Sequence, residues 1–351
     1  MKELKKVTWR SPSNIALVKY WGKHGSQLPN NPSISFTLDK CYSETTFAIA
    51  EKQQVGKDIE LQFYFDKKEN LAFRIKILKY FEEISKDFPF LSKYALSVHS
   101  TNSFPHSSGI ASSASAMSAL ALCLCDMDNK LKKGAAKVDK DKFIKRASHF
   151  ARLGSGSASR SVFALASIWG QTAGIKASAD EYAIPYNKEL HRVFKTYQNS
   201  ILIASSAEKK VSSRLGHALM KSNPFAKARY RQANDNMVEI LAALHSGDLE
   251  KFGAIVETEA MTLHALMMCS TPNFILMTPS TLAMISLIKA FRESTKLPLY
   301  FTLDAGPNIH LLYPENIKSK VIPFIQTELS EYCEGGRIIW DKVGKGPTAT
   351  K

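Results

Sequence analysis

Hydrophobic and polar positions in the first part of the chain alternate in the way typical of strands with one buried face. Apolar and hydroxyl side chains alternate over residues 34–38. Segments 45–50 and 59–65 are rich in β-branched and aromatic residues and predict two more strands. From Phe73 to Ile84 the apolar residues instead recur at helical spacing. Strands and helices therefore mix within the first hundred residues.

A strand at 94–99, a loop of small residues at 101–109 and a helix from Ile110 to Leu124 are predicted next. This order matters because a small-residue loop entering a helix is a common anion site. Further along, the pattern predicts a surface loop at 126–141, a helix ending near Leu153, a small-residue segment at 154–161 and a strand at 164–169.

The second half is dominated by long helical patterns between short strands. Strands and helices do not alternate strictly, so we predict an α+β fold rather than a parallel α/β sheet. We place a boundary in the weakly patterned stretch 177–189, which gives an N-terminal lobe at 1–189 and a C-terminal lobe at 190–351. The predicted elements are strands at 200–205, 300–303, 309–313 and 336–340, and helices at 230–244, 249–268, 280–291 and 321–331.

The charge balance is strongly basic, with 47 Lys and Arg against 32 Asp and Glu among 351 residues, a net charge of +15. Such a surface attracts anions, whether nucleic acid, an anionic membrane or a phosphorylated small molecule. Much of the excess lies between Lys130 and Arg146. Because few aromatic residues interrupt these lysines, we interpret the cluster as a solvated helix face and loop rather than a nucleic-acid surface.

Five cysteines without a CxxC pair argue against a disulfide framework or a zinc site. A reducing compartment suits them best. The first seven residues are charged and lack a signal-peptide core, and no apolar run is long enough to span a bilayer. We therefore expect a cytoplasmic protein with no membrane partner.

Four segments carry candidate chemistry. Residues 105–114 combine Pro, Gly and Ser before a helix, where free N–H groups and the helix dipole favour phosphate, although a capped helix start would look the same. Lys19 ends an apolar run, where it either meets an anion or extends to solvent. Arg160 follows a Gly/Ser turn that forms either an anion clamp or a connector. Asp304 precedes a Gly-Pro turn and either faces a cleft or caps its own backbone.

In their order and spacing, these segments resemble the diphosphomevalonate decarboxylase family of the GHMP kinase superfamily. The resemblance spans roughly residues 8–313. It departs from the family at the loop residues His106, Ser107 and Ser108, at Ser115 and Ala116, and at Arg214 and His217, the last two beside the expected substrate phosphates. The matching segments are 14–16, Lys19-Tyr20-Trp21-Gly22-Lys23, 31–35, 104–113, 154–161, 211–213 and Leu303-Asp304-Ala305-Gly306-Pro307-Asn308.

The resemblance implies a GHMP kinase fold with an N-terminal lobe like ribosomal protein S5 domain 2 and a ferredoxin-like C-terminal lobe. It also implies ATP and Mg²⁺, and a lyase reaction of the mevalonate pathway of isoprenoid (lipid) biosynthesis. In that reaction 5-diphosphomevalonate is transiently phosphorylated at its 3-hydroxyl and then loses CO₂ and phosphate to give isopentenyl diphosphate.

The same resemblance assigns roles to residues of this chain. Asp304, Lys19 and Arg160 would be catalytic, with Asp304 deprotonating the hydroxyl, Lys19 neutralising charge and Arg160 holding the substrate carboxylate. Ser112 would also lie near the metal. The substrate-binding residues would be Asn14, Tyr20, Lys23, Ser155, Ser157, Arg160, Ser213 and Arg214, and the ATP-binding residues would be Ser107, Ser108, Gly109, Ala111, Ser112 and Ser113.

Two alternatives stay open. One is a kinase or decarboxylase of the same superfamily that acts on mevalonate or phosphomevalonate. The other is a non-enzymatic basic protein that binds RNA and makes no use of Asp304. For the enzyme we expect small-molecule partners, no nucleic acid, and a homodimer as the assembly to test.

Overall fold

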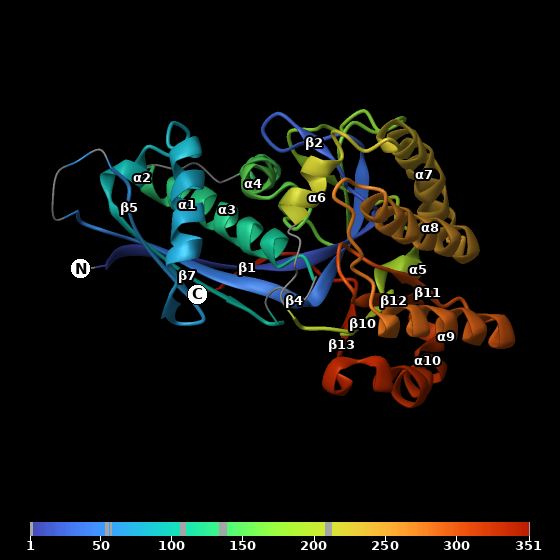
Figure 1. Cartoon of the computed structure of the whole chain (residues 1–351). Coiled ribbons are helices and arrows are strands. Elements are labelled where there is room, and N and C mark those ends of the chain that lie inside the picture. Colours follow the sequence, from blue (N-terminus) through green and yellow to red (C-terminus); the bar gives the residue numbers. More distant parts are fainter. Residues whose placement is uncertain are drawn as a thin grey trace.

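The computed structural model describes residues 3–52, 56, 58–105, 110–132, 139–207 and 213–350, without the side chains of Ser213 and Arg214. Two sheets organise the chain, one in each lobe, and helices pack against each. Figure 1 shows the lobes side by side, joined by the long strands of the first sheet. The α+β prediction is confirmed.

The N-terminal lobe is built on an eight-stranded sheet with the order β14-β1-β4-β7-β5-β6, from which β8 and β9 extend beside β4. Neighbouring strands are antiparallel except β5 and β7, which are parallel. The strands are β1 (Glu3–Val18), β4 (Ser33–Ala50), β5 (Glu60–Phe65), β6 (Lys68–Glu69), β7 (Ala95–Asn102), β8 (Ala166–Trp169), β9 (Ala183–Pro185) and β14 (Thr348–Thr350), with a separate hairpin of β2 (Lys23–His24) and β3 (Leu28–Pro29).

Helices cover one face of this sheet (Figure 1). α3 packs on β1 and β4 and carries small buried residues, which let the helix approach the strands closely. Asn70 caps α1, and Asp139 caps α4 by accepting from main-chain N–H groups. The helices are α1 (Leu71–Ile84), α2 (Phe90–Lys93), α3 (Ser112–Leu131) and α4 (Lys140–Gly154), followed by a 3₁₀ turn at Gly156–Ser159.

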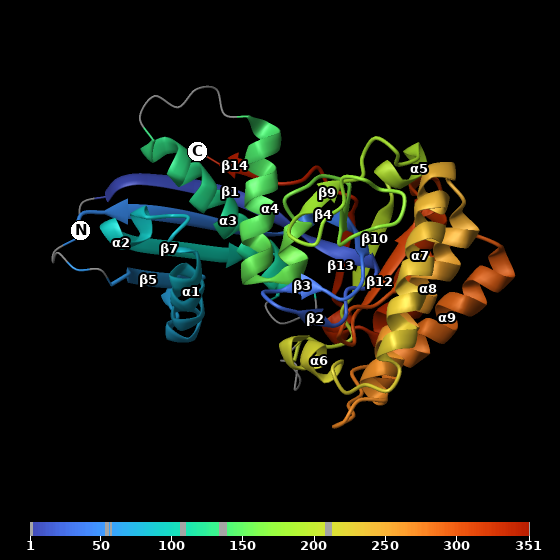
Figure 2. The same cartoon turned by 90° about the horizontal axis from the view of Figure 1, so that it is seen from above.

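The C-terminal lobe contains a four-stranded antiparallel sheet with the order β11-β12-β10-β13. Figure 2 shows α7, α8 and α9 side by side along the outside of this lobe. The strands are β10 (Gln198–Leu202), β11 (Tyr300–Thr302), β12 (Ile309–Tyr313) and β13 (Ile338–Lys342), and the helices are α5 (Arg192–Lys195), α6 (Ser213–Leu219), α7 (Ala226–Ser246), α8 (Leu249–Met268), α9 (Pro279–Thr295) and α10 (Lys318–Phe324).

The two lobes are joined by buried contacts as well as by the chain. The carboxylate of Asp341, on β13, accepts hydrogen bonds from the main-chain N–H groups of Asp39, Lys40 and Cys41 in β4, each at 2.9 Å. Beyond β13 the chain returns to the first sheet, where β14 pairs with β1. The junction beside β1 and β4 is therefore firmly held, and the candidate site lies along it.

Most predicted elements match the structure, with four corrections. The strands predicted separately at 34–38 and 45–50 are one continuous strand, β4. The predicted surface loop at 126–141 is wrong at both ends, because α3 continues to Leu131 and α4 begins at Lys140. Asp126 and Asp128 each pair with a lysine one turn later, which favours helix there. β1 begins at Glu3, before any predicted strand. The helix expected at 321–331 becomes π-helical at Ile325–Leu329 and 3₁₀ after it.

Candidate active site

The site begins where two strands from different lobes end. Lys19 follows β1, and Asp304 follows β11. The Lys19 Nζ lies 2.9 Å from Asp304 Oδ1, with the Lys19 side chain 2% exposed and the Asp304 side chain 25% exposed. Burial lowers the pKa of Lys19, and the carboxylate of Asp304 opposes that shift. Lys19 is thus a buried, paired cation, and the alternative of a lysine extending to solvent is wrong.

The turn after β11 holds Asp304 in place through its main chain. Its carbonyl accepts a hydrogen bond from Gly306 N at 2.7 Å and lies 3.1 Å from a ring nitrogen of His264. Asn308 forms two hydrogen bonds with the main chain of Ser205, each 3.1 Å long. With its backbone fixed in this way, the Asp304 side chain is directed at Lys19 across the junction.

Arg160 lies just after the 3₁₀ turn at Gly156–Ser159, and it is 2% exposed. Its guanidinium donates to Ser35 Oγ at 3.0 Å, to Ser33 Oγ at 2.5 Å and to Asn14 Oδ1 at 3.3–3.4 Å. These contacts occupy three of the five N–H donors of an arginine, all with neutral oxygens. Two N–H groups of a buried cation are left without a partner among the described residues.

These groups lie within electrostatic reach of one another. Burial lowers the pKa of Arg160 to about 10, and the Asp304 carboxylate partly offsets the shift. The charge of Arg160 in turn helps to lower the pKa of Lys19. His310 lies close enough for its pKa to respond to both Asp304 and Lys19, although burial dominates and lowers it to about 4. The structure therefore brings the three predicted catalytic residues into one cluster and adds a neutral histidine.

Tyr20 adds a buried hydroxyl to this cluster. Its ring packs edge-on against Trp169, and its Oη has no hydrogen-bond partner in the described part of the chain. A side chain at Gly156 would collide with this hydroxyl, since a Cβ there would lie 2.9 Å from it. A buried phenol without a partner is costly, so this position favours a ligand that accepts a hydrogen bond.

His217, on α6, packs between the rings of Tyr20 and Trp21. Its Nδ1 accepts from the main-chain N–H of Gly22 at 2.9 Å, and burial lowers its pKa to about 3. The ring is therefore neutral near pH 7 and carries its proton on Nε2. Lys23 lies nearby, on the β2–β3 hairpin, and donates to Gln27 at 2.6 Å.

The predicted phosphate cradle is described only in part. Ser107, Ser108 and Gly109 lie outside the described residues, as do the side chains of Ser213 and Arg214. α3 begins at Ser112 after Ala111, whose φ of 47° is left-handed. No side chain in the described part of the chain caps this helix start, which leaves its N–H groups available to an anion.

The helix start also lies beside the predicted substrate residues. Ser113 Oγ is 3.3 Å from Ser155 Oγ, and Ser13 Oγ donates to the carbonyl of Ile110 at 2.6 Å. The Ser157 carbonyl accepts from Asn14, which also contacts Arg160. The predicted substrate and nucleotide residues are thus adjacent along β1, α3 and the 3₁₀ turn.

Sequence reasoning missed a second group around Lys19, formed by Arg229, Glu259, His264 and His310. The first two are buried charges on long helices, Arg229 in the first turn of α7 and Glu259 in the middle of α8. Glu259 stands in an apolar stretch of α8, which was an available sign of a buried, paired carboxylate. Among the described residues, no group of three or more His, Cys, Asp and Glu is arranged to hold a metal ion.

Comparison with known proteins identifies the family. Residues 11–183 match the family described as the diphosphomevalonate decarboxylase-like N-terminal domain, and residues 200–343 match the mevalonate 5-diphosphate decarboxylase C-terminal domain. The diphosphomevalonate decarboxylase of Ganoderma lucidum is 29% identical over 336 residues, covering 91% of this chain and 81% of that protein.

Solved structures agree with these matches. The mevalonate diphosphate decarboxylase of Staphylococcus aureus has a TM-score of 0.82 at 28% identity, covering 99% of this chain and 98% of the other. A structure of MDDEF in complex with MVAPP, AMPPCP and magnesium has a TM-score of 0.81 at 26% identity and covers 99% of both chains. The predicted GHMP kinase fold with two lobes is confirmed, and the chain belongs to the diphosphomevalonate decarboxylase family.

Proposed function

We propose that this chain decarboxylates 5-diphosphomevalonate with ATP, giving isopentenyl diphosphate, CO₂, ADP and phosphate. The observation that carries the proposal is the buried Lys19–Asp304 pair beside Arg160, a cation with two uncommitted N–H donors. A related protein binds MVAPP, AMPPCP and magnesium together, which supports the same pair of substrates here.

The pair Lys19–Asp304 suits the first half of the reaction. Asp304 takes the proton of the 3-hydroxyl while the oxygen attacks the γ-phosphorus of ATP and ADP leaves. Lys19 stays protonated beside Asp304 and stabilises the negative charge of the transferred group. The quarter-exposed carboxylate is open to the substrate, whereas the buried ammonium is held behind it.

Arg160 suits the second half. The bond between C3 and the phosphorylated oxygen breaks, and positive charge develops at C3. The bond between C2 and the carboxylate carbon then supplies the electrons of the new double bond, and CO₂ leaves. A planar guanidinium with two free N–H groups holds the carboxylate in line for this step. Asn14, Ser155 and Ser157 support that substrate end.

The two phosphate-bearing groups are assigned to different sets of residues. For the substrate diphosphate we propose Tyr20, Lys23, Ser213 and Arg214, with the unpaired Tyr20 hydroxyl as a donor. For ATP we propose the uncapped start of α3 with Ala111, Ser112 and Ser113, together with Ser107, Ser108 and Gly109. Ser112 would offer its hydroxyl to Mg²⁺, and the metal would neutralise phosphate charge there.

The test is a coupled assay that measures ADP and CO₂ from mevalonate, its monophosphate and its diphosphate. We expect equal amounts of ADP and CO₂, with the highest kcat/KM for the diphosphate. ADP without CO₂ would instead show a kinase of the same superfamily. A preference for the monophosphate would contradict the diphosphate assignment but leave the decarboxylase chemistry intact.

The setting of the enzyme is a separate proposal. All five cysteines are free, which suits a reducing compartment such as the cytoplasm. Among the described helices, none is both long and apolar enough to cross a bilayer. We also propose a homodimer, which sedimentation analysis at micromolar concentration would test.

A further inference from the structure

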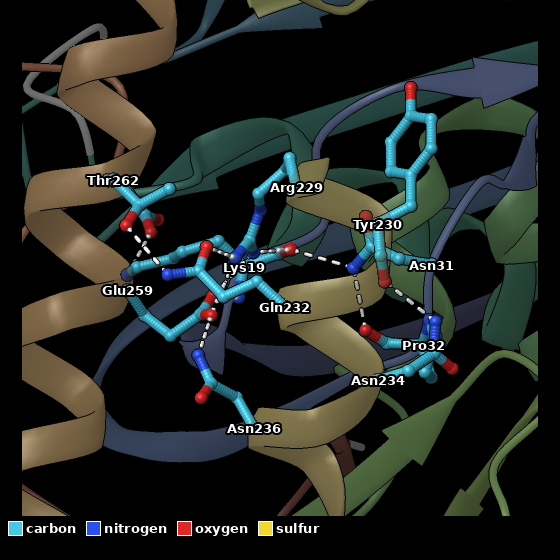
Figure 3. A network of polar contacts seen from close by, with 11 residues as sticks. Lys19, Asn31, Pro32, Arg229, Tyr230, Gln232, Asn234, Asn236, Glu259 and Thr262 are labelled. Carbon is cyan, nitrogen blue, oxygen red and sulfur yellow. Dashed lines mark hydrogen bonds and ion pairs between the residues drawn. The ribbon is translucent and has the colours of Figure 1, made fainter. Parts of the chain in front are cut away.

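An ion pair lies directly behind Lys19, inside the C-terminal lobe. Arg229 on α7 and Glu259 on α8 form two parallel hydrogen bonds of 2.6 and 2.5 Å, and their side chains are 1% and 0% exposed. Figure 3 shows both side chains meeting at Lys19, with Asn236 and Gln232 beside them. The roles proposed above make no use of this pair.

Both members of the pair bind the main chain of Lys19. Glu259 Oε2 accepts from the Lys19 N–H at 2.7 Å, and Arg229 Nη2 donates to the Lys19 carbonyl at 3.0 Å. Asn31 donates to the same carbonyl at 3.0 Å. Asn236 donates to Glu259 Oε1 at 2.6 Å, so both oxygens of the carboxylate receive two hydrogen bonds.

The main chain needs these partners because the β ladder has just ended. The last pair of β1 with β4 joins Val18 and Ile34, so residue 19 lies beyond the ladder but inside the protein. Without Glu259 and Arg229, a buried N–H and C=O would lose hydrogen bonds. A buried ion pair stabilises a fold little more than apolar residues would in its place. Stability alone therefore does not explain why both members of this pair bind the main chain of one residue.

We propose that Arg229 and Glu259 are positioning residues, which fix the backbone of Lys19 so that its side chain meets Asp304. The inference rests on the proposed function for its catalytic consequence. α7 and α8 thereby set the direction of a side chain that belongs to the N-terminal lobe. Figure 3 shows the connection as a continuous set of hydrogen bonds from these helices to residue 19.

The charge of Glu259 has a second effect. Among the groups around Lys19, the carboxylates of Asp304 and Glu259 raise its pKa, whereas burial and the charge of Arg160 lower it. Arg229 adds a further positive charge, and His310 is neutral near pH 7. Removing the negative charge at Glu259 therefore lowers the pKa of Lys19. Since Lys19 acts as a cation, activity is then lost at a lower alkaline pH than in the parent.

The first experiment is the pH profile of kcat for Glu259→Gln. We expect its alkaline limb to move down by about one pH unit, the scale for a nearby opposite charge. We also expect kcat to fall by about tenfold or more, since small displacements of a catalytic group have large effects. KM for the substrate should change by less than about twofold.

A matched control lies two residues away on the same helix. Glu257 also forms two hydrogen bonds with an arginine, Arg292, but contacts the main chain of Phe301 rather than Lys19. Glu257→Gln removes an ion pair of the same two-bond geometry, although a less buried one, and should leave kcat and the pH profile as in the parent. If both variants behave alike, the pair only holds helices together and the proposal is overturned.

A second variant keeps the proposal testable if Glu259→Gln does not fold. Arg229→Met with Glu259→Met removes both charges without leaving one unpaired. We expect a folded protein with reduced kcat, and a crystal structure in which Lys19 Nζ and Asp304 Oδ1 are separated by more than roughly 3.5 Å, beyond hydrogen-bond reach. A contact kept at the parental distance would overturn the inference. The distance in that structure can be measured whether or not the enzyme is active. It therefore tests the positioning role separately from the proposed function, which fails if the parent enzyme releases no CO₂.

Discussion

Two buried cations lie in the same cluster, one paired with a carboxylate and the other surrounded by neutral groups. Lys19 and Arg160 are each 2% exposed. Lys19 contacts the carboxylate of Asp304 directly and has Glu259 behind its main chain. Arg160 is surrounded in the described structure by the hydroxyls of Ser33 and Ser35 and the amide of Asn14.

The difference defines what each cation can do. A buried charge is tolerated when it is paired or fully hydrogen-bonded. Lys19 meets that condition within the protein, so it can stabilise a charge that appears only briefly beside Asp304. Arg160 has neutral partners and two N–H groups left over, so it is suited to hold a lasting anion supplied by the substrate. Lys19 is therefore suited to stabilise the transition state, and Arg160 is suited to bind the substrate.

The most direct test of this difference between Lys19 and Arg160 is to remove the counter-anion of Lys19. Asp304→Asn keeps the shape of the side chain but leaves Lys19 without its paired carboxylate and the hydroxyl without its base. We expect turnover to fall by about 10² or more, the usual scale for losing a general base. ATP binding and the far-ultraviolet circular dichroism spectrum should be unchanged. Turnover near that of the parent would contradict the proposed role of Asp304 as the general base.

The next test changes the binding cation while keeping its charge. Arg160→Lys removes the planar fork and its contacts with Ser33, Ser35 and Asn14. We expect kcat/KM to fall by about 10- to 100-fold, the range for losing contacts to a charged group. Arg10→Lys, at the half-exposed Arg10–Glu44 pair, is the control and should stay within about twofold. Equal losses in both variants would contradict the assignment.

A smaller effect concerns the neutral histidine beside the paired cation. Burial lowers the pKa of His310 to about 4, whereas an unfolded histidine titrates near 6.5. Between these values the unfolded chain binds a proton that the folded chain does not, so stability falls as the pH decreases. We expect the slope of unfolding free energy against pH to be smaller in His310→Gln by about 1 kcal/mol per pH unit. Urea unfolding at pH 7, 6 and 5 measures it, and parallel curves would show that folding does not lower the pKa of His310.

Individual residues of the site were predictable from the sequence, but the contacts between them were not. An apolar run that stops at Lys19 and an aspartate before a Gly-Pro turn each predict a strand end. Their contact joins residues 285 positions apart, which no local pattern encodes. Family resemblance, rather than periodicity, brought the segments together.

The missed features have physical reasons as well. Residues 3–6 of β1 are all exposed and three of the four are charged, so no alternation of buried and exposed side chains marks the start of that strand. Arg229 lies among polar residues of α7, where it looks like an ordinary surface charge until α8 is packed against it. The polar stretch after Asp126 looks like a loop because its salt bridges depend on helical geometry that composition does not reveal.

The smallest expected effect comes from a third class of cation, the exposed lysines of α4. Lys140, Lys142 and Lys145 are exposed, and Lys142 pairs with the exposed Asp139. Replacing all three with glutamine should leave saturated turnover within about twofold, because such charges are screened over roughly 10 Å. The salt dependence of kcat/KM should weaken, since these charges help attract polyanionic substrates.

The control for that variant lies on the same helix and separates surface charge from structure. Arg146 donates to the buried Asp128 at 2.5 Å and packs over the ring of Phe88. Arg146→Gln should therefore destabilise the protein by about 1–2 kcal/mol, because a buried carboxylate loses a charged partner. The triple lysine variant should not. A large fall in saturated turnover of the triple variant would show that the surface lysines act in the chemistry, and that burial does not distinguish the working cations of this protein from the rest.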